Sequence, residues 1–161
     1  MATSALRGKA AIVGVADAVS STGQLDTRGR ELETAMMAEA LADAGLTVAD
    51  VDGICHAGPS LFSSMAFAEH VDIRPVFTDS TNTGGSSFEV HAEHAAAAIN
   101  AGVCDVVLSV YAGTPRGDRS RNLPPGGLPA MPPGDPGPQW ETPYGLRPPI
   151  GPYALAASRH M

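Results

Sequence analysis

The residues best suited to chemistry form the run Asn-Thr-Gly-Gly-Ser-Ser from Asn82 to Ser87, ahead of an alanine-rich helix predicted over residues 86–101. Glycines at 84 and 85 let the backbone approach a ligand closely. The first amides of the helix point outward as donors with a partial positive charge, which would stabilise an oxyanion, a thiolate or a phosphate. The run has no cysteine, histidine or lysine, so its candidate nucleophiles are the hydroxyls of Ser86 and Ser87.

The remaining pattern supplies the elements that must position this run. Short apolar segments predict strands at 10–15, 51–56, 75–78 and 105–111. Helical periodicity predicts helices at 30–44, 63–70 and 86–101, with Gly45 and Gly102 closing the first and the last. Strands that alternate with helices indicate an α/β fold, with a mostly parallel sheet covered by helices on both faces.

The organisation changes after residue 112, because twelve of the fourteen prolines lie between Pro115 and Pro152. We therefore divide the chain into a βαβαβαβ unit at 1–112, a Pro/Gly-rich loop region at 113–148, and the start of a further helix at 149–161. That last helical pattern reaches Met161 without a stop signal, which is typical of a fragment of a longer fold.

Composition excludes several function classes. The net charge of −7 and the single lysine, Lys9, argue against a nucleic-acid partner. Arg116, Arg119 and Arg121 are the one basic cluster, which could meet a phosphate-bearing cofactor or could simply be solvated. No dinucleotide fingerprint or membrane-spanning run occurs, and two cysteines make no disulfide framework, so the expectation is a soluble protein of the reducing cytoplasm.

Two other groupings could carry chemistry. His91 and His94 are spaced to share a helix face, so a metal site is conceivable, but no third ligand with recognisable spacing appears and we expect no metal. The alternative, which we prefer, is that both histidines satisfy neighbouring backbone groups. Cys55 beside His56 looks like a thiol and base pair, but adjacent strand residues point to opposite faces. We therefore expect Cys55 and Cys104 to be small core residues.

Several strings together resemble the thiolase superfamily, specifically its lipid-transfer branch related to the sterol carrier protein thiolase domain. The strings are Lys9–Val15 (KAAIVGV), Ala40–Gly45 (ALADAG) followed by Val51–Gly53 (VDG), Ala97–Gly102 (AAINAG) leading to Asp105–Leu108 (DVVL), and Pro143–Gly145 (PYG) leading to Tyr153–Ala156 (YALA). The resemblance covers the N-terminal part of that fold. It implies a homodimer, a possible OB-fold partner protein, and a coenzyme A thioester as substrate with no permanently bound cofactor.

The resemblance also places the thiolase nucleophile. The reactive cysteine of thiolases stands at the start of this helix, three residues after an asparagine, and counting from Asn82 gives Gly85. The cysteine is therefore absent, and no acyl-enzyme thioester can form on it. The family's Gly-His-Pro histidine and second cysteine belong to the C-terminal half, and nothing in these 161 residues matches them. The chain alone should be inactive.

The resemblance to the lipid-transfer branch implies carbon-carbon cleavage of a β-hydroxyacyl-CoA by a retro-aldol reaction, in lipid or steroid side-chain degradation. Backbone amides near Asn82 and Gly84 would hold the thioester oxygen, Arg116 and Arg119 would meet the coenzyme A phosphates, and acid and base groups would come from outside these residues. Two alternatives stay open: a noncatalytic acyl-CoA or lipid-binding subunit working with a partner, and a truncated fragment without function.

Overall fold

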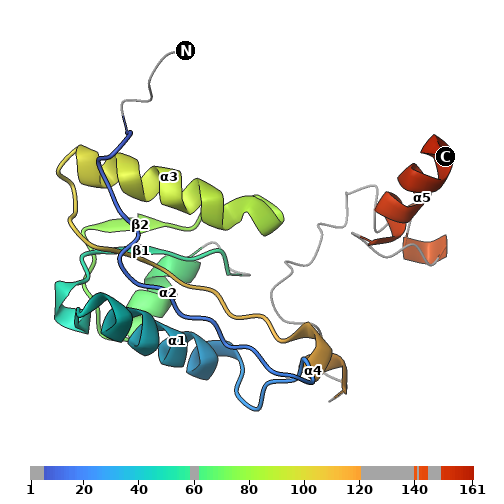
Figure 1. Cartoon of the computed structure of the whole chain (residues 1–161), viewed down its shortest axis with the longest axis horizontal. Coiled ribbons are helices and arrows are strands. Elements are labelled where there is room, and N and C mark those ends of the chain that lie inside the picture. Colours follow the sequence, from blue (N-terminus) through green and yellow to red (C-terminus); the bar gives the residue numbers. More distant parts are fainter. Residues whose placement is uncertain (1–5, 59–61, 121–139, 141, 145–149) are drawn as a thin grey trace. The chain divides into compact units, whose positions relative to one another are not determined.

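The computed structural model describes residues 6–58, 62–120, 140, 142–144 and 150–161, with the backbone alone at Arg119, Thr142 and Ile150. The chain divides into two compact units, Met1–Leu128 and Pro129–Met161. The larger unit holds the predicted α/β alternation (Figure 1). Among the described residues, no helix is both long enough and apolar enough to span a bilayer.

The centre of the larger unit is a parallel three-stranded sheet. Its strands are β1 (Gly53–Cys55), β2 (Phe77–Asp79) and β3 (Val107–Ser109), in the order β2-β1-β3. Gly53 of β1 pairs with Phe77 on one side and Val107 on the other, and all three strands run in the same direction. The strands predicted at 51–56, 75–78 and 105–111 are therefore confirmed, although each is shorter than its apolar run.

Helices cover both faces of this sheet, as predicted (Figure 1). Helices α1 (Gly29–Ala44) and α2 (Ser63–His70) lie on one face, and α3 (Ser87–Asn100) lies on the other. The core packs side chains of α1 and α2 against β1 and β3; its buried members are Met37, Leu41, Val51, Ile54, Phe67, Ala68, Ile73, Leu108 and Val110. A 3-10 turn, η1 (Val48–Asp50), leads from α1 into β1.

Gly45 ends α1 as predicted. It adopts a left-handed conformation with φ of 69°, where a side chain would be strained, and its N–H donates to the carbonyls of Ala42 and Leu41. The N–H of Leu46 also returns to Leu41 O at 2.8 Å. This closure turns the chain back toward the sheet.

The strand predicted at 10–15 is wrong. That segment is not part of the sheet among the described residues, and Ile12 is 83% exposed. Its position is fixed by α1: an added Cβ on Gly14 would lie 2.2 Å from the carbonyl oxygen of Ala40, and the Val15 N–H donates to the Asp43 carboxylate at 3.0 Å. The run has the apolar composition of a strand, but among the described residues no strand pairs with it.

The predicted loop region 113–148 also needs correction where it is described. Residues Pro115–Ser120 form the short helix α4, with Pro115 at its first position, where a missing N–H costs nothing. In the smaller unit, η4 (Thr142–Tyr144) is a 3-10 turn. Helix α5 (Ile150–His160) confirms the helix predicted from 149. The rest of the loop region lies outside the described residues.

Candidate functional site

The run from Asn82 to Ser87 forms a compact turn that begins α3. Residues Gly84–Ser86 make one 3-10 turn, η2, and Gly84 has a φ of 78°, which requires glycine. The Asn82 side-chain oxygen accepts the Gly84 N–H at 3.0 Å. The Ser87 N–H donates to the Gly84 carbonyl. Two of the backbone N–H groups predicted to face a ligand, those of Gly84 and Ser87, are thus hydrogen-bonded within the turn.

Gly85, the position that the resemblance assigns to the nucleophile, faces open space. No heavy atom lies within 4 Å of a Cβ added there, and its φ is not in the left-handed region. A side chain could therefore be accommodated at this position without strain. Glycine at 85 reflects no packing need in the described structure.

The two serine hydroxyls differ in their environment. The Ser87 side chain is completely buried, accepts the Thr83 N–H at 3.0 Å and donates to the Gly84 carbonyl at 2.7 Å. The Ser86 hydroxyl is exposed and lies 3.3 Å from the Thr83 hydroxyl. Among the contacts of the described residues, neither hydroxyl meets a histidine, lysine or carboxylate that could remove its proton. The role of Ser86 or Ser87 as a nucleophile stays a prediction, since no base contacts either hydroxyl among the described residues.

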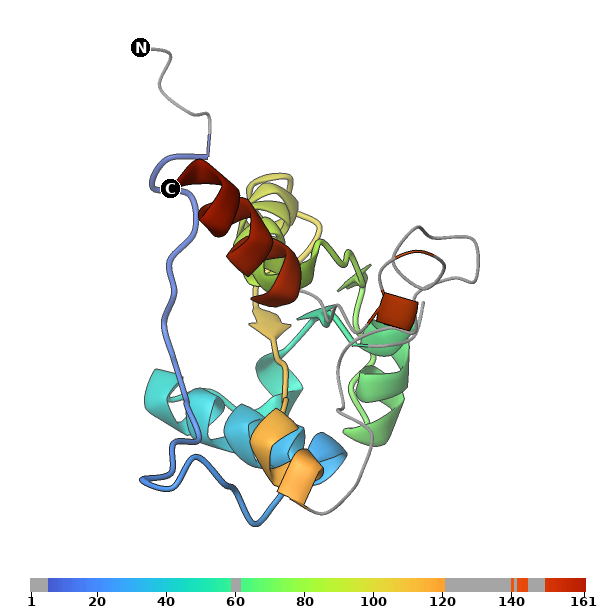
Figure 2. The same ribbon diagram turned by 90° about the vertical axis from the view of Figure 1, so that its right-hand side faces the viewer.

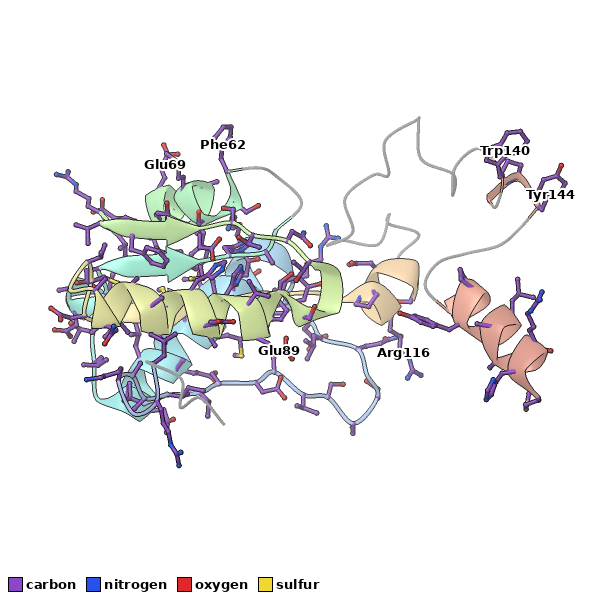
Figure 3. All side chains as sticks on the ribbon, turned by 90° about the horizontal axis from the view of Figure 1, so that it is seen from above. Phe62, Glu69, Glu89, Arg116, Trp140 and Tyr144 are labelled. Carbon is purple, nitrogen blue, oxygen red and sulfur yellow. The ribbon has the colours of Figure 1, made fainter. Side chains whose placement is uncertain are left out.

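The predicted phosphate contacts stand apart from the turn. Arg116 projects from α4 and is exposed, with its guanidinium near Gly23 (Figure 3). Arg119 belongs to the same helix, and only its backbone is described. Glu89 occupies the first turn of α3, where its carboxylate complements the helix dipole and would oppose an anion approaching the turn (Figure 3).

The histidines of α3 are held by β2 and the residues after it. His91 is fully buried and its Nε2 donates to the Thr81 carbonyl at 2.9 Å, which is the backbone role expected for it. His94 instead pairs with the Asp79 carboxylate at 2.6 Å. The hydrogen bonds from Thr81 and His94 keep the pKa of Asp79 below its ordinary value despite its partial burial. Among the described side chains, no three His, Cys, Asp or Glu groups gather as a metal set.

The structure reveals a second polar cluster, directly after β1, that the sequence reasoning missed. His56 is 2% exposed and Glu33 of α1 is 6% exposed, and the His56 Nε2–H donates to Glu33 Oε1 at 3.0 Å. The Arg30 guanidinium donates to the other Glu33 oxygen at 3.0 Å and lies over the Phe67 ring, on which the His56 ring is stacked. We call Arg30, Glu33 and His56 the buried triad, in which the Arg30 side chain reaches the surface and is 39% exposed.

The pKa of Glu33 is set by its two partners and by burial. Burial tends to raise the pKa of Glu33, but the hydrogen bond and charge of His56, with the charge of Arg30, outweigh burial and lower it. His56 Nδ1 is buried and has no hydrogen-bond partner in the described part of the chain. An added Cβ on Gly58 would lie 2.8 Å from Nδ1, so glycine is what fits there.

A signal for the triad was present in the sequence. Glu33 stands four residues before Met37 and eight before Leu41, so it shares the apolar face of its helix. A carboxylate on a buried face requires a partner. His56 stands beside Cys55 in the sequence, and no short motif connects it to Glu33.

The cysteines are core residues, as predicted. Cys55 is fully buried, and burial, then the nearby Asp79 and Cys104, raises its pKa to about 12. Cys104 is 3% exposed and its pKa is also raised, mainly by burial. A thiol held in its neutral form is a poor nucleophile. Neither cysteine is therefore placed to act as a thiolate nucleophile.

The turn and the triad both follow the carboxyl ends of parallel strands, β2 and β1 respectively, and these strands are neighbours. The carboxyl edge of a parallel sheet is where α/β proteins bind their ligands. The molecule is thus an α/β protein with a candidate site at that edge.

Comparison with known proteins shows which enzymes this chain is similar to. The chain matches no family model. It is 34% identical over 110 residues to 17-hydroxy-3-oxo-4-pregnene-20-carboxyl-CoA lyase of Mycobacterium tuberculosis, across 66% of this chain and 28% of the lyase. It is also similar in structure to the Ltp2-ChsH2(DUF35) aldolase, with a TM-score of 0.65 and 25% identity across 86% of this chain and 34% of that chain.

Both similar proteins are named for lyase or aldolase activity, and the lyase is named for a steroid carboxyl-CoA. The chain is therefore similar to one protein named as a lyase of a pregnene carboxyl-CoA and to one named as an aldolase. It spans about a third or less of the length of each.

Proposed function

We propose that this chain is the N-terminal part of a thiolase-like protein that cleaves a β-hydroxyacyl-CoA by a retro-aldol reaction in lipid or steroid side-chain degradation. The observation that carries the proposal is the 34% identity over 110 residues to a carboxyl-CoA lyase. The glycine at position 85 and the buried cysteines with raised pKa values support it, because neither supplies the thiolate that a thiolase route needs.

The reaction breaks the bond between the α- and β-carbons. A base removes the proton of the β-hydroxyl, the β-carbon becomes a carbonyl, and the bonding electrons move to the α-carbon as an enolate of the thioester. That enolate is then protonated to give the shortened acyl-CoA. In this chain, backbone amides at the start of α3 would polarise the thioester oxygen, while the acid and base would come from polypeptide outside these residues.

The test uses the full-length protein with a β-hydroxyacyl-CoA, and separately a β-ketoacyl-CoA with free coenzyme A. Cleavage of the first to a carbonyl product and a shortened acyl-CoA is expected, while thiolysis of the second at ordinary thiolase rates would overturn the proposal. Gly85→Pro removes one amide donor whereas Gly85→Ala retains it, so only the proline variant should lose cleavage rate, by about 10²-fold.

A second candidate is a noncatalytic acyl-CoA or lipid-binding subunit, favoured by the absence of any base against the Ser86 and Ser87 hydroxyls among the described contacts. The similar aldolase is named as a pair of proteins, so a partner, which we expect to carry an OB fold, fits either candidate. Acyl-CoA binding by the protein with its partner, and no turnover of any β-hydroxyacyl-CoA, would favour this candidate. A homodimer in the cytoplasm is the assembly and location that we propose for both.

A further inference from the structure

Two histidines of α3 reach the residues that follow β2 and hold one of them, Thr81, by its main chain. The His91 Nε2–H donates to the Thr81 carbonyl at 2.9 Å. The Thr81 N–H donates to Asp79 Oδ1 at 2.8 Å, and the other Asp79 oxygen accepts a hydrogen bond from His94 Nδ1 at 2.6 Å. Figure 2 looks onto the end of the sheet at which β2 stops and α3 begins. Helix α3 therefore holds Thr81 at its carbonyl directly and at its N–H through Asp79.

Thr81 directly precedes the turn Asn82–Ser87. A trans peptide is planar, with its carbonyl and its N–H pointing in opposite directions, so the bond from His91 to the Thr81 carbonyl also fixes the direction of the Asn82 N–H. The Asn82 side-chain oxygen accepts the Gly84 N–H at 3.0 Å. The placement of Asn82 thus also affects the placement of the Gly84 backbone, and the contacts of α3 extend into the turn.

The surroundings of the His91 ring fix its orientation. The ring is fully buried and meets the Phe88 ring edge to face, with centroids 6.0 Å apart and planes at 87°. Its Nδ1 is buried and has no hydrogen-bond partner among the described residues. A buried nitrogen without a partner is unfavourable, so an apolar side chain would stabilise this helix position better. The hydrogen bond to Thr81 is therefore the property that distinguishes histidine from an apolar residue here.

We propose that His91, His94 and Asp79 are positioning residues for the turn, because they orient the peptide between Thr81 and Asn82 and with it the amides that face the thioester oxygen. The inference rests on the proposed function, in which backbone amides of the turn polarise that oxygen. Negative charge on the oxygen grows as the enolate forms, so misplaced amides weaken transition-state binding more than substrate binding. Loss of these contacts should therefore lower kcat and leave KM nearly unchanged.

The first experiment needs no enzymatic activity. A Gly85→Cys background places a thiol in the turn, and its alkylation by iodoacetamide at pH 7 reports how well the turn stabilises an anion. His91→Leu should slow this alkylation about two- to fivefold, the size of one helix-terminus interaction. His91→Gln keeps an N–H donor near the Nε2 position and should restore most of the rate. Equal rates in the two folded variants would overturn the inference.

A second pair of variants avoids the buried position, because the His94 side chain is 47% exposed. In the same Gly85→Cys background, His94→Ala should slow alkylation by less than His91→Leu does. His94→Asn, whose amide can replace the Nδ1–H donor, should restore the rate. Both replacements are uncharged, so a difference between them reports the contact with Asp79 and not a change of charge. Identical rates for the two variants would overturn the role of the Asp79–His94 pair, whether or not His91→Leu folds.

The second experiment uses the full-length protein and a β-hydroxyacyl-CoA. His91→Leu should lower kcat about tenfold with KM nearly unchanged, and His91→Gln should recover most of the loss. An unchanged kcat, or a raised KM alone, in His91→Leu would overturn the positioning role. A wild-type protein that cleaves no β-hydroxyacyl-CoA would overturn the proposed function instead, and the alkylation rates would still show whether the histidines position the turn.

Discussion

The two candidate regions at the carboxyl edge of the sheet are built in opposite ways. The turn Asn82–Ser87 after β2 is open and offers backbone groups, with no titratable side chain in it. In the buried triad after β1, the Glu33 carboxylate contacts both Arg30 and His56, and His56 and Glu33 are almost fully enclosed. The ionisable side chains of this edge thus lie in the triad and not in the turn that we predict to bind a ligand. In the described structure, the triad is enclosed at the edge of the sheet and the turn remains accessible.

We expect the largest loss of stability when the carboxylate of the triad is removed. Glu33→Ala leaves His56 Nε2 buried without its acceptor and Arg30 without its partner, so we expect a loss of about 3 kcal/mol in the free energy of unfolding. Urea titration of the purified chain measures it. Glu31→Ala, at an exposed position on the same helix, is the control and should change stability by less than about 0.5 kcal/mol. A Glu33→Ala variant as stable as the control would mean that the triad is not structural.

Acid should weaken the triad by less than the substitution does, because protonation keeps the carboxyl group in place. The pKa of folded Glu33 lies below its ordinary value of 4.5. A group with a lowered folded pKa stabilises the fold above its unfolded pKa, and that contribution is lost as pH falls through the folded pKa. Unfolding free energy should therefore decline below about pH 4.5 in the wild type. Glu33→Gln should show a shallower decline over the same range, and parallel curves would contradict this assignment.

The turn depends on a single buried hydroxyl, which predicts a smaller effect. Ser87→Ala removes the acceptor of the Thr83 N–H and the donor to the Gly84 carbonyl, so we expect a loss of about 1–2 kcal/mol. Ser86→Ala, at the adjacent exposed position, should be nearly neutral. Thermal unfolding of the two variants side by side separates them. A larger loss for Ser86→Ala would show that the turn is organised differently.

Sequence reasoning found most of the fold because the elements have strong local signals. The apolar periodicity and Gly45 specified α1, and the apolar runs specified β1, β2 and β3. It failed at residues 10–15 because apolar composition says nothing about whether a pairing strand is beside the segment. It missed the contact between Glu33 and His56, 23 residues apart, because only the packing of α1 on the sheet brings them together.

We expect the smallest change in stability for a substitution in the turn, Gly85→Cys. Gly85→Cys places a thiol in open space at the start of α3, so the free energy of unfolding should change by less than about 0.5 kcal/mol. A helix N-terminus lowers a thiol pKa, so this cysteine should react with iodoacetamide at pH 7 several-fold to about tenfold faster than Glu93→Cys, which is exposed in the middle of the same helix. Cys55 and Cys104 serve as internal references, since their raised pKa values should keep them unreactive. Equal rates for the two introduced thiols would show that the turn does not stabilise an anion. The turn would then be no better a candidate for a ligand site than the buried triad.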